Sequence, residues 1–70
     1  MDIKAEFGKR LAEHIKEMRL SQAKAARMCD VGEAHMSRIL NGDQNLTLEI
    51  IYRICNTLKV EASELIPIDK

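Results

Sequence analysis

The stretch SQAKAARMCDVGEAHMSRILNG, residues 21–42, carries the strongest structural signal in this chain of 70 residues. Ser21 is a favourable N-cap for a helix over residues 22–29, because its hydroxyl can accept a hydrogen bond from a free backbone N–H of the first turn. A break over residues 30–32 follows, and apolar residues then recur at helical spacing over residues 33–41. The stretch therefore predicts two short helices joined by a tight turn.

The spacing within this stretch is more specific than amphipathic helices alone would require. Two helices that cross steeply after a three-residue turn need a small residue at the crossing, and Ala26 supplies it. Asp30 lies in the turn and tolerates a left-handed backbone. Val31, Met36 and Ile39 are the apolar side chains with which the second helix would pack on the core. These features in one register favour a helix-turn-helix over a generic helical bundle, with the second helix placed to contact DNA bases.

Three further helices are expected outside this stretch. The first covers residues 3–18 and contains Gly8, whose cost within a helix predicts a close approach to another helix. Thr47 caps the next, and the last covers residues 62–66 and ends before Pro67. The apolar face of the helix after Thr47 is predicted to be Leu48, Ile51, Ile54, Cys55 and Leu58.

No alternating strand pattern is present, so the predicted fold is all-α: a compact bundle of five helices in which the second and third form the helix-turn-helix. Residues 1–70 form one domain in this interpretation, with a core over residues 3–66 and a short C-terminal tail over residues 67–70.

Charge is balanced overall but divided along the chain. Eleven basic and 11 acidic side chains give a formal net charge of zero, which argues against binding a polyanion through net charge alone. Residues 1–40 hold eight basic and six acidic side chains, and residues 41–70 hold three and five. This asymmetry can orient the chain towards a polyanion.

Other classes of function find no support in the residue pattern. No His, Cys and Asp constellation, metal-ligand spacing or glycine-rich phosphate loop is present, so neither enzymatic activity nor a metal or cofactor is expected. Cys29 and Cys55 lie on apolar helix faces and are expected to be reduced core residues, a redox-sensitive thiol being the alternative. No apolar run approaches the ~20 residues of a membrane span, so a cytoplasmic protein is expected.

The chain from Phe7 to Leu65 resembles the Cro- and phage-repressor-like, XRE-type helix-turn-helix family. The matching residues are Phe7-Gly8, Leu20-Ser21-Gln22, Ala26, Val31, Met36-Ser37-Arg38-Ile39, Asn41-Gly42, Leu48, Leu58, Val60 and Glu64-Leu65. The resemblance implies a domain of the phage-repressor type that binds double-stranded operator DNA as a homodimer and regulates transcription, as a repressor or a controller protein.

This chain departs from the family pattern at four places, one of which is the apolar pair Leu40 and Ile15 where the family often has an ion pair. Arg19 stands where the family has glycine in the turn after the first helix, which places its backbone at positive φ. Ala25 stands where a large apolar residue is usual, and Met28 or Met36 would fill the space. Asp43 begins a loop that is commonly basic, which lowers the affinity expected for phosphate.

The resemblance also assigns the residues that contact DNA. Arg38 would bond guanine, Glu33 would accept from cytosine, and Ala34 would touch a thymine methyl group. The residues expected to contact bases are Glu33, Ala34, His35, Ser37 and Arg38. Those expected to contact the DNA backbone are Ser21, Gln22, Lys24, Asn41 and Gln44.

Simpler alternatives stand beside these assignments. Arg38 could instead form a solvated ion pair with Glu33 or Asp43. Glu33 could serve only to complement the helix dipole, and His35 could simply face solvent.

The sequence does not decide which partners the chain binds besides DNA. Ile50, Ile66 and Ile68 lie off the predicted core and could form a two-fold dimer interface, with local packing over the core edge as the alternative. The rival function is a protein-interaction module, an antitoxin or anti-repressor that uses this fold to bind a toxin or another regulator.

Overall fold

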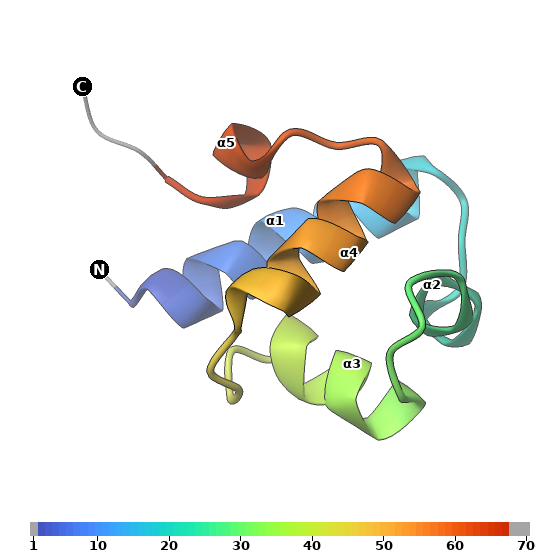
Figure 1. The fold of residues 1–70 in the computed structure, drawn as a ribbon, viewed down its shortest axis with the longest axis horizontal. Helices are drawn as coiled ribbons and strands as arrows, with labels where there is room; N and C mark the ends of the chain where they lie inside the picture. Colours follow the sequence, from blue (N-terminus) through green and yellow to red (C-terminus); the bar gives the residue numbers. More distant parts are fainter. Residues whose placement is uncertain (1, 68–70) are drawn as a thin grey trace.

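A computed structural model describes residues 2–67 of the chain, which form five α-helices and no strand. They are α1 (Ile3–Glu17), α2 (Gln22–Met28), α3 (Glu33–Leu40), α4 (Leu48–Leu58) and α5 (Ala62–Leu65). Figure 1 shows α1 and α4 crossing the middle of the molecule, α5 above them, α3 along the lower edge and α2 at one end. The prediction of an all-α, five-helix fold is confirmed. Within residues 2–67, no helix has both the length and the apolar character needed to span a membrane.

Side chains at the predicted positions cap three of the helices. Asp2, Ser21 and Thr47 each accept from a backbone N–H two or three residues later, at 3.0, 3.1 and 3.2 Å. These bonds satisfy donors that the first helical turn leaves free. At the start of α5 the carboxylate of Glu64 accepts from the backbone N–H of Glu61 at 3.0 Å, a cap that the sequence reading missed.

Four helices end in the same way, with one residue in the left-handed conformation. These residues are Arg19, Asp30, Gly42 and Lys59, with φ of 59°, 56°, 76° and 57°. In each case the next N–H bonds to the carbonyl five residues earlier, at 2.9 to 3.1 Å, which is the Schellman arrangement. Positive φ was predicted at Arg19 and Asp30 but not at Lys59. The predicted ends of the first, second, third and fifth helices each lie one residue too far along the chain.

The core lies between the helices, and α1 packs on both α3 and α5. A Cβ atom on Gly8 would lie 2.5 Å from the carbonyl oxygen of Ile39 and 2.6 Å from that of Leu40. The close helix approach predicted at Gly8 is therefore confirmed, and its partner is α3. The buried apolar residues are Phe7, Leu11, Ile15, Ala25, Ala26, Cys29, Val31, Met36, Ile39, Ile54, Leu58, Val60 and Leu65.

The buried face of α4 differs from the predicted one. Leu48 was placed on that face, but 85% of its surface is exposed. Ile54 and Leu58 are buried, and Ile50 and Ile51 are half-buried and pack against the core. Ile50 thus takes the inward position, and because residues two apart on a helix point about 200° apart, Leu48 points outward.

Candidate nucleic-acid interface

Small and apolar side chains pack α2 against α3. Ala25 and Ala26 of α2 and Met36 of α3 are fully buried, and Val31 in the connecting turn is buried as well. Of the two methionines expected to fill the space beside Ala25, Met36 is fully buried, whereas Met28 remains 43% exposed. Because α3 packs on both α1 and α2, its inner side is covered and its outer side stays open.

The outer side of α3 carries most of the residues predicted to contact bases. Glu33, Ala34 and Arg38 are exposed, and Ser37 is half-buried. Figure 1 shows α3 at the lower edge of the molecule, with no other part of the described chain beneath it. The structure thus gathers these side chains on one accessible helix surface.

His35 is placed differently from its neighbours. It is half-buried, and its Nε2 atom is buried without a hydrogen-bond partner among the described residues. On a helix, residue 35 lies above residue 39, and Ile39 is part of the core. Less of His35 is therefore available to a ligand than of Glu33, Ala34 or Arg38, and the alternative that it simply faces solvent does not describe its buried Nε2.

Arg38 has no ion-pair partner within residues 2–67. The ion pairs in this part of the chain are Arg10–Glu6 at 3.0 Å, Arg53–Glu49 at 3.3 Å and His14–Glu64 at 4.0 Å. The alternative of a solvated pair with Glu33 or Asp43 is therefore not found. The guanidinium group of Arg38 is free to bond an external acceptor.

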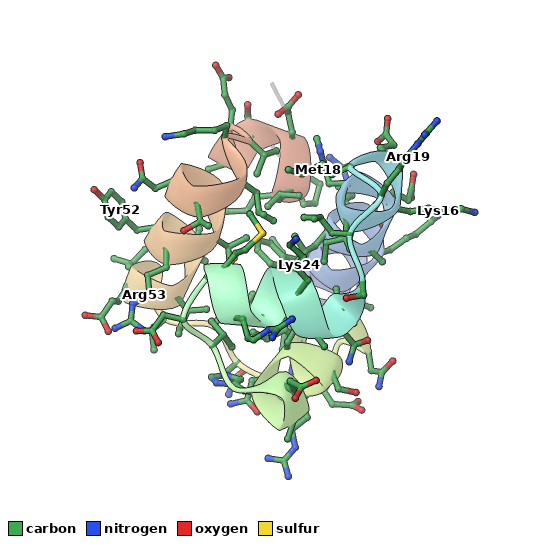
Figure 2. The ribbon with its side chains drawn as sticks, turned by 90° about the vertical axis from the view of Figure 1, so that its right-hand side faces the viewer. Lys16, Met18, Arg19, Lys24, Tyr52 and Arg53 are labelled. Atoms are coloured by element: carbon green, nitrogen blue, oxygen red, sulfur yellow. The ribbon has the colours of Figure 1, made fainter. Side chains whose placement is uncertain are left out.

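The residues predicted to contact the DNA backbone lie at two places. Ser21, Gln22 and Lys24 are exposed at the start of α2, and Figure 2 shows Lys24 on the outer side of that helix. The Ser21 oxygen accepts from the backbone N–H of Lys24, which leaves the hydroxyl proton of Ser21 able to donate. Asn41 is exposed and Gln44 half-buried just after α3.

A contact from outside the motif reaches the turn between α2 and α3. Arg53 of α4 donates from Nη1 to the carbonyl oxygen of Asp30 at 3.3 Å and from Nη2 to the carboxylate of Glu49 at 3.3 Å. Figure 2 shows Arg53 where α4 approaches the segment that connects α2 and α3. This contact was not predicted, because no periodicity in the sequence relates residues 53 and 30.

Both cysteines are free thiols; Cys29 is buried in the core, as predicted, and Cys55 is half-buried and packs against it. Burial raises the pKa of the Cys29 thiol; a hydrogen bond with Thr57 lowers this pKa in part, and the neighbouring Cys55 raises it further. Burial also raises the pKa of Cys55. Both side chains therefore remain protonated at neutral pH. Within residues 2–67, no group of three or more His, Cys, Asp or Glu side chains is arranged to hold a metal ion.

Comparison with known proteins agrees with this geometry. A helix-turn-helix family model matches residues 11–65. No curated protein sequence matches the chain. Among solved structures, the restriction-modification controller protein C.AhdI from Aeromonas hydrophila is 28% identical, with a TM-score of 0.83, over 87% of this chain and 92% of its own.

Two structures of SinR share the fold at lower identity. The complex of SinR, the master regulator for biofilm formation, with DNA is 23% identical, with a TM-score of 0.79, over 84% of this chain and 95% of its own. The complex of SinR with SinI is 22% identical, with a TM-score of 0.81, over 87% of this chain and 60% of its own.

Proposed function

This chain belongs to the helix-turn-helix family of the Cro- and phage-repressor type, and we propose that it binds double-stranded DNA sequence-specifically to regulate transcription. Membership of this family supports DNA-binding transcriptional regulation as the general function. The finer assignments are the recognition residues, the dimer and the repressor or controller role. The first two are supported by the placement of α3 and by the exposed apolar side chains of α4.

The observation that carries the proposal is the placement of α3. The close approach at Gly8 seats this helix on α1, and the buried side chains of Met36 and Ile39 fix its inner face. A helix held rigidly with one polar side outward fits the major groove, which is wide enough to admit an α-helix. In this role Glu33, Ala34 and Arg38 would contact base edges.

Each recognition residue has chemistry suited to a particular base. Arg38 can form two bonds with O6 and N7 of guanine, Glu33 can accept from N4 of cytosine, and Ala34 can touch the thymine methyl group. Ser37 and the accessible part of His35 lie at the edges of this surface. The five residues predicted for the DNA backbone would bond phosphates from the start of α2 and from the segment just after α3, and such contacts set register and orientation rather than sequence preference.

We further propose that the protein acts as a homodimer, because one recognition helix contacts only a few base pairs. Ile50 and Ile66, two residues predicted for the interface, are half-buried and pack against the core, and Ile68 lies outside the described residues. The large apolar side chains most open on α4 are instead Leu48 and Tyr52, which are 85% and 68% exposed. These two residues form what we call the α4 patch.

A second copy of this chain is the partner that the α4 patch fits. Leu48 and Tyr52 are four residues apart and lie side by side on the helix. Glu49 and Arg53 border them and are paired with each other within one copy, so that the edge of the patch carries no net charge that would oppose contact with a second copy. Figure 2 shows Tyr52 pointing sideways from α4, whereas α3 lies at the lower edge. A neighbour on this patch would therefore leave the outer side of α3 free for DNA.

The test of the proposed function is selection from a randomised duplex library, followed by anisotropy titration of the selected duplex over a series of salt concentrations. A sequence-specific binder enriches one consensus and shows a steep negative slope of log K against log salt, about −0.9 for each phosphate neutralised. A library that yields no consensus would refute sequence-specific binding.

The rival function is a protein-interaction module, and the neutral net charge of the chain favours it. SinR is found both with DNA and with the protein SinI, so one fold can support either kind of contact. If this chain served mainly to bind a toxin or another regulator, its affinity for DNA would be weak and would show little dependence on sequence.

A further inference from the structure

We propose that Arg53 is a positioning residue for α3, because its guanidinium group holds the peptide unit that links the two helices of the helix-turn-helix. The proposal rests on the DNA-binding function proposed above. It assigns to α4 a part in setting the direction of the recognition helix.

The peptide unit between Asp30 and Val31 is held from two sides. Its N–H group donates to the carbonyl of Ala26 in α2 at 2.9 Å. Its carbonyl accepts from Nη1 of Arg53 in α4 at 3.3 Å. Because α3 begins shortly after this unit, any rotation of the unit would swing α3 relative to α2. The two bonds oppose that rotation.

The contact made by Arg53 differs from the other side-chain hydrogen bonds of the molecule. Apart from the bond between the Cys29 thiol and Thr57, every other such bond within residues 2–67 joins residues two to four apart and stabilises a single helix or its cap. The bond from Arg53 to Asp30 spans 23 positions. Of the two side-chain hydrogen bonds in the described chain that tie one element to another, it is the one that reaches the turn before α3.

The start of α3 offers little local restraint of its own. Its N-cap is Gly32, which provides no side-chain cap. A Cβ atom at Gly32 would meet nothing within 4 Å, so crowding does not fix the backbone there either. Besides the packing of Met36 and Ile39 further along the helix, the direction in which α3 leaves the turn therefore depends on the burial of Val31 and on the hold of Arg53.

Glu49 keeps Arg53 in place from the other side. Its carboxylate lies 3.3 Å from Nη2 of Arg53, one helical turn away. A guanidinium group can bridge two acceptors in fixed geometry, which the single ammonium group of lysine does less well. The side chain of Arg53 is 39% exposed, so the bridge is of moderate strength and its loss should affect binding by about threefold to tenfold.

The experiment compares Arg53→Met with Arg10→Met as the matched control, because Arg10 also pairs with a glutamate four residues earlier on its own helix, at 3.0 Å. The probe is the duplex selected by the unaltered protein from a randomised library. Arg53→Met should bind this duplex about threefold to tenfold more weakly, with an unchanged salt slope and with faster hydrogen exchange at the amide of Val31. Arg10→Met loses the same charge and an ion pair of the same spacing but no bond to the turn, and it should stay within about twofold of the unaltered protein. If Arg53→Met does not fold, Arg53→Lys replaces it, and a positioning role predicts the same losses.

Three results would overturn the inference. A salt slope reduced in magnitude by about one in Arg53→Met would mean that Arg53 contacts a phosphate directly. Unchanged affinity for the duplex and unchanged hydrogen exchange at Val31 in Arg53→Met would mean that the bond to Asp30 does not position α3. Wild-type affinity and wild-type exchange in Arg53→Lys would mean that a positive charge at residue 53 is sufficient. If the library yields no bound duplex, the proposed function fails, but the exchange at Val31 still tests the hold of Arg53 on the turn.

Discussion

Arg38 projects from α3 without an ion-pair partner in residues 2–67, and this position makes it the sharpest test of base recognition. Arg38→Ala should cost about 1–3 kcal/mol at one base pair of the selected duplex and relax the preference at that pair. The measurement is an anisotropy titration against duplexes changed at one position at a time. Equal losses on all of these duplexes would refute the base-contacting role.

Gln22 gives the contrasting case for the same titrations. It is exposed at the first position of α2, where we expect its side chain to bond a phosphate rather than a base edge. Gln22→Ala should therefore weaken binding to every duplex by a similar factor. A changed order of preference among the duplexes would show that Gln22 contacts a base.

The left-handed residues at the helix ends are positions where a substitution by glycine could stabilise the fold. Three of the four left-handed positions are occupied by Arg19, Asp30 and Lys59, although glycine avoids a penalty of roughly 1–2 kcal/mol there. Arg19→Gly should raise the free energy of unfolding by about 1 kcal/mol in urea denaturation, because the strain is relieved in the folded state.

Gly42 provides the reverse control for Arg19. Its φ is 76°, and a Cβ atom there would lie 2.8 Å from Cα of Ala5. Gly42→Ala should therefore destabilise the protein while Arg19→Gly stabilises it. Equal stability of the unaltered protein and Arg19→Gly would mean that the left-handed backbone at Arg19 carries no strain.

The contact of α1 with α3 depends on the missing side chain at Gly8. Within a helix, Gly→Ala usually gains about 1 kcal/mol, but here the added Cβ would meet two carbonyl oxygens of α3 at 2.6 Å or less. Gly8→Ala should therefore destabilise the fold by about 1–3 kcal/mol in urea denaturation, because α3 must move. Ala12→Gly at an exposed position of α1 reports the ordinary propensity effect, and a gain in stability for Gly8→Ala would contradict the close approach.

Local chemistry explains which parts of this architecture could be predicted. The caps at Ser21 and Thr47 follow from side chains that bond within a few residues, and the small residue at the helix crossing follows from its spacing to the turn. The exposure of Leu48 could not be predicted, because Leu48, Ile50 and Ile51 are all apolar and only packing decides which of them turns inward. The link from Arg53 to the turn is a tertiary contact that leaves no pattern in the sequence.

Considered as a whole, the molecule separates two kinds of surface. The polar outer side of α3 lies at the lower edge in both views, and Tyr52 of the α4 patch points to one side (Figures 1 and 2). Arg53 lies between them, bonded to the turn before α3 and bordering the patch through Glu49. Contacts between two copies at the patch would thus lie close to the residue that positions the recognition helix.

The double variant Leu48→Ser, Tyr52→Ser tests the α4 patch as a dimer interface. Both residues are exposed within one copy, so the free energy of unfolding of the monomer should stay within about 0.5 kcal/mol. The dimer should weaken by at least tenfold, because two-fold symmetry removes each apolar side chain twice and burial of one is worth about 1.5–3 kcal/mol. Sedimentation equilibrium measures the change, and Met28→Ser, an exposed apolar residue of α2, serves as the control.

A protein that sediments as a monomer both free and on its selected duplex would contradict the dimer, and an unaffected dimer in the double variant would place the interface elsewhere.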